Sequence, residues 1–224
     1  MFPVTNNRSL IVLLSSIPAV IAELNGFYNP LLYRTSHVLY WCADFTSFVL
    51  VPSFLVYWLA TYANIWPKHY GLQFLPRMAD FLGTSALLGF ILFITYFVAR
   101  YIGWVLTWRW YTPSEFTYGT AIPHGLFRLP AVLYMSATAG IVESIFLLSL
   151  PWYFWRNFLN LAHRRNSFAW LSSVVFASCH WEQGLHNVIA AFAFNYVACY
   201  LYWKLNDLWP IIGAHVLVDI VEFF

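Results

Sequence analysis

Seven long apolar runs, separated by short polar stretches, follow one another along the chain. They lie at about 9–24, 38–62, 79–108, 130–155, 168–182, 186–203 and 209–224. About 20 apolar residues in a helix cross the hydrocarbon core of a bilayer, so most of these runs are long enough to span it or nearly so. We therefore predict an all-α, polytopic transmembrane helix bundle with about seven spans (six to eight).

Turn-forming residues mark the polar stretches between the runs. We expect the first run to end at Asn25-Gly26, with Asn29-Pro30 reinforcing the break. The fifth run is the shortest, which predicts a segment that is partly re-entrant. No internal repeat is evident, and we treat residues 1–224 as a single integral membrane domain.

The composition favours a membrane location. The chain is 61% hydrophobic and only 9% charged, whereas about 25% of residues are charged in ordinary soluble domains. We therefore expect a multi-pass integral membrane protein, surrounded by the lipid bilayer of the plasma (inner) membrane. The net charge is +2 and the basic residues are scattered, which predicts no nucleic-acid partner. The sequence gives no oligomeric state.

One glutamate inside the fourth run is the first candidate functional residue. A charge at the centre of a spanning helix costs roughly 2.5–3.5 kcal/mol, so such residues are retained where they face one another, a cavity or a ligand. Glu143 lies near the middle of its run, and no other acidic or basic residue lies between Arg128 and Arg156. It can serve as a general base, or as a protonated residue bonded to a neighbouring helix.

Two histidines and an aspartate in the later runs are the other candidates. His180 lies near the end of the fifth run, where an interfacial hydrogen bond and a functional role are both open. His215 and Asp219 are four residues apart, which places both on one face of a helix. The carboxylate can then orient the imidazole, or the two can form a structural pair in the bundle.

Together these residues suit two kinds of chemistry. One glutamate, two histidines and an aspartate on three helices can activate water and bind an oxyanion with an imidazole. Two histidines and a carboxylate can also hold zinc with a position open for water. The spacing does not choose between the two. Of the other ionisable residues nearby, we expect Glu182 and His186 to belong to an aqueous loop and Glu222 to be exposed.

At these positions the chain resembles the CPBP family of intramembrane proteases, which includes CAAX prenyl endopeptidases and bacteriocin-processing or immunity proteins. The family pattern is Glu-Glu-x-x-x-Arg, then Phe-x-x-x-His, then a late His-x-x-x-Asn or Asp. Glu143 matches the first glutamate, Phe176 to His180 the second motif and His215 to Asp219 the third. The similar region covers about residues 130–224.

The resemblance implies an intramembrane endopeptidase that hydrolyses a peptide bond of a membrane-anchored protein or peptide. In that scheme Glu143 and His180 activate water, while His215 and Asp219 stabilise the oxyanion. No third strong ligand such as a cysteine converges on the two histidines, so we expect a glutamic-type enzyme with no cofactor, and zinc is the alternative.

Two departures from the family pattern leave other functions open. Ser144 replaces the second glutamate, and Leu148 replaces the arginine. A catalytically inactive membrane scaffold or immunity protein of the same fold is therefore the main alternative. A proton-coupled transporter or channel is a third hypothesis, which the missing repeat disfavours.

Overall fold

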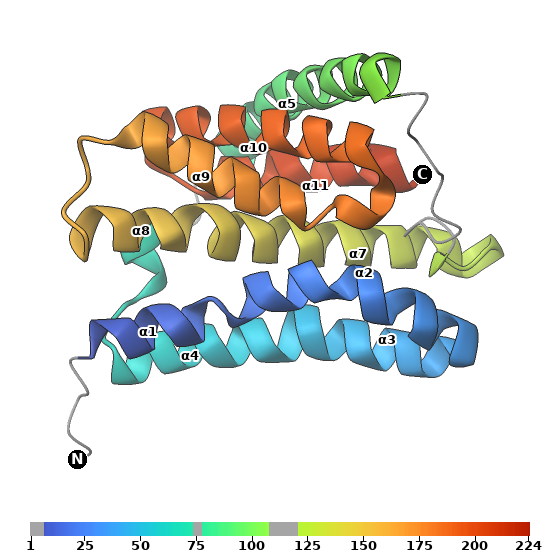
Figure 1. Cartoon of the computed structure of the whole chain (residues 1–224), viewed down its shortest axis with the longest axis horizontal. Coiled ribbons are helices and arrows are strands. Elements are labelled where there is room, and N and C mark those ends of the chain that lie inside the picture. Colours follow the sequence, from blue (N-terminus) through green and yellow to red (C-terminus); the bar gives the residue numbers. More distant parts are fainter. Residues whose placement is uncertain (1–6, 74–77, 108–120) are drawn as a thin grey trace.

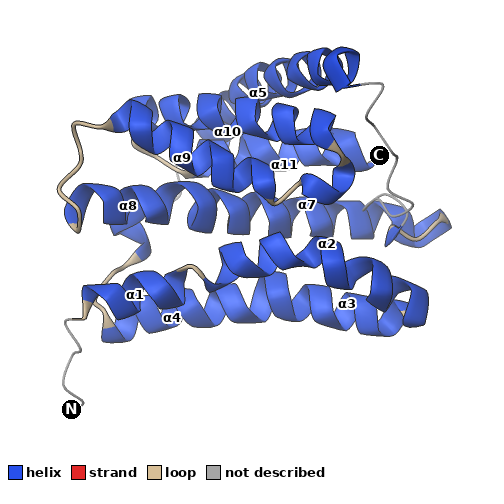
Figure 2. Ribbon diagram, in the orientation of Figure 1, coloured by secondary structure: helices blue, strands red, loops and turns tan. Residues whose placement is uncertain are grey.

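The described part of the chain consists of helices joined by short connections, with no strand (Figure 2). The structure is a computed structural model, and it describes residues 7–73, 78–107 and 121–224. Trp108, the last residue of the third predicted run, lies outside these ranges. The described residues confirm the predicted all-α helical bundle.

The N-terminal helices form two antiparallel segments. The first contains α1 (Arg8–Ser15) and α2 (Ile17–Thr35), and the second contains α3 (His37–Phe45), the π-helical η1 (Thr46–Leu50) and α4 (Val51–Tyr62). A short 3-10 turn, η2 (Pro67–Tyr70), follows. Together α1 to α4 form one layer of the molecule, at the bottom of Figure 1.

The remaining helices form the layers above. These are α5 (Met78–Thr107), η3 (Gly125–Phe127), α7 (Arg128–Glu143), the π-helical η4 (Ser144–Ser149), α8 (Leu150–Asn157), α9 (Arg165–Ser178), η5 (Trp181–Gln183), α10 (Leu185–Leu205) and α11 (Trp209–Phe223). The α7–η4–α8 rod lies directly above α1 to α4 in Figure 1. Above it, α11 packs on α7, and α5 covers α10 and α11.

Five segments among the described residues are long and apolar enough to cross a membrane. They are Arg8–Thr35, His37–Tyr62, Met78–Thr107, Gly125–Asn157 and Leu185–Leu205. The helices of the fifth and seventh predicted runs, α9 and α11, contain 14 and 15 residues. At about 1.5 Å per residue they are shorter than the ~30 Å hydrocarbon core. Five of the seven predicted spans therefore have spanning length.

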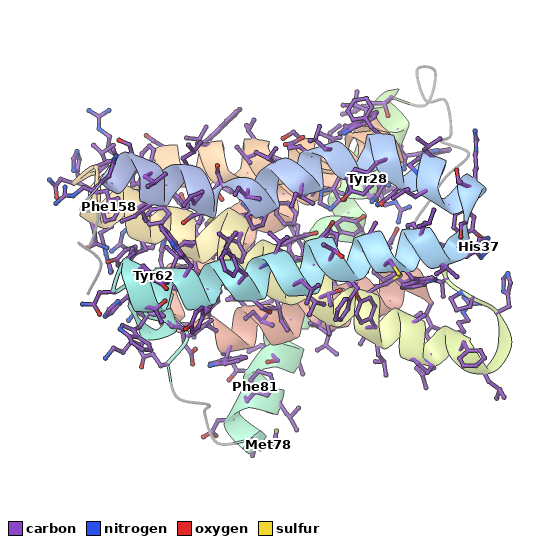
Figure 3. The ribbon with its side chains drawn as sticks, turned by 90° about the horizontal axis from the view of Figure 1, so that it is seen from below. Tyr28, His37, Tyr62, Met78, Phe81 and Phe158 are labelled. Atoms are coloured by element: carbon purple, nitrogen blue, oxygen red, sulfur yellow. The ribbon has the colours of Figure 1, made fainter. Side chains whose placement is uncertain are left out.

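Large apolar side chains on the outside of the bundle fit contact with lipid. Phe27, Phe54 and Phe90 are each more than 60% exposed. Figure 3 looks onto the α1 to α4 layer, where Tyr28 and His37 lie toward one end and Tyr62 toward the other. Apolar surface on this scale is costly in water and favourable in a bilayer, in keeping with an integral membrane protein.

The predicted break at Asn25-Gly26 is wrong, because α2 continues through it and through Pro30 to Thr35. Gly26 allows Trp181 to approach the backbone of α2 closely and does not form a turn. A Cβ added at Gly26 would lie 2.8 Å from Cζ2 of Trp181, so only glycine lets the indole ring pack against α2 here. The helix ends before Ser36, whose extended backbone begins the next segment.

Prolines shape the two π-helical turns. Pro151 has no N–H to bond the carbonyl of Leu147 one turn earlier, and Ser172 on α9 donates its hydroxyl to that oxygen at 2.7 Å. Pro52 stands in the same relation to Phe48 in η1. The wider turns therefore follow from sequence, and η4 begins directly after Glu143. Such turns are frequent at functional sites.

Candidate active site

A close crossing of α7 and α11 brings two of the predicted motifs together. A Cβ added at Gly140 would lie 2.8 Å from Cγ2 of Val216 and 3.2 Å from its backbone nitrogen. The absence of a side chain on Gly140 therefore lets the two helices touch. Glu143 lies one turn after this glycine, and His215 directly precedes Val216, so the crossing places the two candidate side chains next to each other.

His215 lies between two carboxylates. Its Nε2 is 3.6 Å from Oε2 of Glu143 and 3.7 Å from Oδ2 of Asp219. Both distances exceed hydrogen-bond length, so a water molecule can bridge the imidazole and the two carboxylates. The side chain of His215 is 6% exposed, and those of Glu143 and Asp219 are 14% and 18% exposed.

Ser144 contacts the other nitrogen of this imidazole. Its Oγ lies 3.4 Å from Nδ1 of His215, and the serine is buried. With the hydroxyl as donor, Nδ1 is the acceptor and Nε2 carries the proton. The residue that replaces the family's second glutamate is therefore part of the site. Leu148, which replaces the arginine, is buried in the main hydrophobic core.

His180, the remaining candidate, lies in the turn just after α9. Its Nδ1 is 2.9 Å from the carbonyl oxygen of Phe176. Because a carbonyl only accepts, Nδ1 carries the proton and Nε2 is left as an acceptor. The ring also packs against Phe176, whose other contacts include the ring of His215 at 5.9 Å between centroids.

One cavity joins all four predicted residues, Glu143, His180, His215 and Asp219. Its volume is about 90 Å³, enough for several water molecules. The motif helices α7, α9 and α11 supply one side of it. The N-terminal layer supplies another side, through residues of α2, α3 and η1.

Three of the sequence-based assignments near the site are wrong. Glu182 and His186, expected in an aqueous loop, are only 8% and 6% exposed, because the turn between α9 and α10 packs against α2 and α5. Glu222, expected to be exposed, accepts two hydrogen bonds from Nη1 of Arg100, at 2.6 and 2.7 Å. This ion pair joins α5 to α11 one turn after Asp219.

Three polar residues of α2 and α3 also belong to the site or support it, and the sequence analysis did not select them. Glu23 accepts a hydrogen bond from the hydroxyl of Ser178 and contacts Sγ of Cys179 at 3.6 Å, directly before His180. Asn25 and Asp44 line the cavity itself. Glu23 and Asp44 are acids inside apolar runs, the same signal that singled out Glu143.

Zinc has limited support from the donor geometry. Among the residues that the structure describes, no group of three or more His, Cys, Asp or Glu side chains is arranged to hold a metal ion. Nε2 of His180 and Nε2 of His215 are the two nitrogens that would have to bind a zinc ion together.

Comparison with known families is consistent with this geometry. Residues 123–221 match the family model described as type II CAAX prenyl endopeptidase Rce1-like. All four predicted site residues lie within that match, and the resemblance to the CPBP family is confirmed. The match supports an intramembrane protease of the general CAAX type. No curated protein and no solved structure shows significant similarity to the chain.

Proposed function

We propose that this protein is an intramembrane endopeptidase that hydrolyses a peptide bond of a membrane-anchored protein or peptide, using water activated by Glu143. The observation that supports the proposal best is the position of His215 Nε2, within 3.7 Å of a carboxylate oxygen on each side in a buried cavity. A cavity of this kind can hold both a water molecule and a substrate carbonyl.

Activation of water would use Glu143 and His180. The carboxylate of Glu143 takes a proton from the water while the water oxygen attacks the carbonyl carbon of the substrate. Nε2 of His180, left as an acceptor by the bond from Nδ1 to Phe176, accepts a hydrogen bond from the second O–H of the water. The water is thereby oriented by two acceptors before it reacts.

Stabilisation of the oxyanion would fall to His215. With Ser144 donating to Nδ1, the proton on Nε2 can donate to the carbonyl oxygen as it becomes negative. In its protonated form Asp219, whose Oδ2 lies 3.7 Å from the same nitrogen, can donate a second hydrogen bond to that oxygen. The proton held by Glu143 then passes to the departing amine, the C–N bond breaks, and an acid and an amine are released.

The surroundings fit a substrate in the bilayer. The site lies inside a bundle whose outer surface is apolar, so a membrane-anchored segment can approach from the lipid. We propose the plasma (inner) membrane as the location and no cofactor for the reaction. Zinc is the alternative that the test below addresses.

Cleavage of membrane-anchored peptides by the purified protein in liposomes tests the proposal. Glu143→Gln keeps the shape of the side chain but removes the base, so cleavage should fall at least 100-fold while the protein stays folded. Asp80→Asn, at an exposed carboxylate in the first turn of α5, is the matched control and should cleave normally. Full activity of Glu143→Gln would refute the mechanism. Loss of wild-type activity with a chelator, restored by added Zn²⁺ alone, would establish zinc.

A catalytically inactive scaffold or immunity protein is the second candidate. The replacement of two family positions by Ser144 and Leu148 favours it. The discriminating result is a Glu143→Gln variant that retains the biological phenotype of the wild-type gene, together with no cleavage of any peptide by either protein.

A further inference from the structure

Two buried acceptors face the cavity from the N-terminal layer. Asp44 on α3 and Asn25 on α2 are each 6% exposed, and both line the cavity that holds Glu143. Oδ2 of Asp44 and Oδ1 of Asn25 make no hydrogen bond within the described residues. A buried acceptor without a donor costs about 1–3 kcal/mol, and more when it is charged. The two atoms are therefore available to a ligand that brings donors.

The charge balance of the cavity indicates what kind of donor fits. Four carboxylates line it, those of Asp44, Glu143, Asp219 and Glu222, and its described lining contains no lysine or arginine. The nearby cation, Arg100, is held by Glu222 through two short bonds. The family arginine is absent because Leu148 stands in its place. A positive charge in this cavity would have to come largely from the ligand.

The environment of Asp44 favours a cation over a neutral donor. The phenol of Tyr134 on α7 lies near the carboxylate of Asp44 and can donate a hydrogen bond to it, but a neutral donor leaves the negative charge uncompensated. A carboxylate buried in an apolar layer gains most from a charge-assisted hydrogen bond, which is about twice as strong as a neutral one. Asn25 lines the same cavity from α2, so its Oδ1 can accept a second hydrogen from a group bound there.

We propose that Asp44 and Asn25 form a subsite that binds a lysine or arginine side chain of the substrate, close to the peptide bond that Glu143 attacks. This inference rests on the proposed function and specifies its substrate: a membrane-anchored segment with a basic residue beside the scissile bond. The subsite lies outside residues 123–221, so it belongs to the part of the chain that the family match does not cover.

Binding measured without cleavage tests the subsite. The full-length Glu143→Gln protein in phosphatidylcholine vesicles is titrated with two acetylated, membrane-anchored fluorescent peptides, which differ only in lysine or norleucine at one position near the expected cleavage bond. We expect the lysine peptide to bind about 10- to 100-fold more tightly. Scanning the lysine along the peptide locates the preferred position. Equal affinity at every position overturns the proposal.

Substitution at Asp44 separates recognition from folding. Asp44→Asn, added to Glu143→Gln, keeps the shape of the residue and removes its charge, so the lysine preference should disappear while norleucine binding stays the same. Asp44→Glu should retain the preference, and Asp80→Asn on α5 is the exposed control. A loss of affinity that is equal for both peptides means a structural role for Asp44 and also overturns the proposal.

The two hypotheses fail in different ways. If Glu143→Gln still cleaves but prefers lysine through Asp44, the proposed mechanism fails and the subsite stands. If Glu143→Gln abolishes cleavage but the two peptides bind equally, the mechanism stands and the subsite fails.

Discussion

The helices from α7 to α11 and the layer from α1 to α4 contribute to the same cavity in different ways. The first region supplies Glu143, His180, His215 and Asp219, the groups proposed to act on the peptide bond. The second supplies acceptors that face them, Asn25 and Asp44. Chemistry and recognition are thus assigned to separate parts of the chain, so substitutions in the two regions should have different kinetic effects.

The two regions also differ in how they are held. In the most apolar stretch of each segment, 56% of the residues are buried in Gly125–Asn157, but only 33% in Arg8–Thr35 and 22% in His37–Tyr62. The N-terminal layer exposes most of its surface and joins the second motif through a few polar contacts. Glu23 bonds Ser178, and its backbone oxygen accepts from Nε1 of Trp181 at 3.2 Å. Loss of such a contact can displace the layer without unfolding the motif helices.

The largest effect that sharpens this comparison is expected at His215. His215→Ala removes the proposed oxyanion donor, so kcat for cleavage of a membrane-anchored peptide should fall about 100- to 1,000-fold, with a much smaller change in KM. His163→Ala, at an exposed histidine in the loop between α8 and α9, is the matched control. A reduction of less than about threefold at His215 would remove it from the mechanism.

The proximity of His215 and Asp219 could be predicted from sequence because both lie within a helix of regular geometry. Four residues between His215 and Asp219 correspond to one helical turn, and the structure has both beside Glu143. The close crossing at Gly140 could not be predicted, because a glycine in an apolar run gives no indication of which helix it meets.

A middle-sized effect is expected at Glu23, which joins the two regions. Glu23→Ala removes the acceptor for Ser178, beside His180, so kcat should fall about 10-fold. The melting temperature should fall slightly as well, because the half-buried hydroxyl of Ser178 then keeps only the carbonyl oxygen of Val175 as an acceptor. Glu23→Gln keeps an acceptor and should recover most of both quantities. If Glu23→Ala lowers the melting temperature but leaves kcat unchanged, the contact supports the fold alone.

The contributions of the N-terminal layer were missed for physical reasons that particular residues illustrate. Asn25-Gly26 reads as a turn in isolation, yet the helix continues because Trp181 packs into the space that the glycine leaves. Asp44 stands in an apolar run like Glu143, but no local pattern links it to residues 100 positions later along the chain. Such links depend on packing between helices, which the order of apolar and polar residues does not encode.

The smallest effect is expected at Ser144, inside the motif region. Its hydroxyl lies 3.4 Å from Nδ1 of His215, a long hydrogen bond, so Ser144→Ala should lower kcat only about 3- to 10-fold. The comparison variant is Ser136→Ala on the same helix, since Oγ of Ser136 is buried and makes no hydrogen bond within the described residues. Its loss should leave kcat unchanged. Equal kcat values for the two variants would mean that Ser144 does not orient His215, and that the family position it occupies has lost its role in this chain.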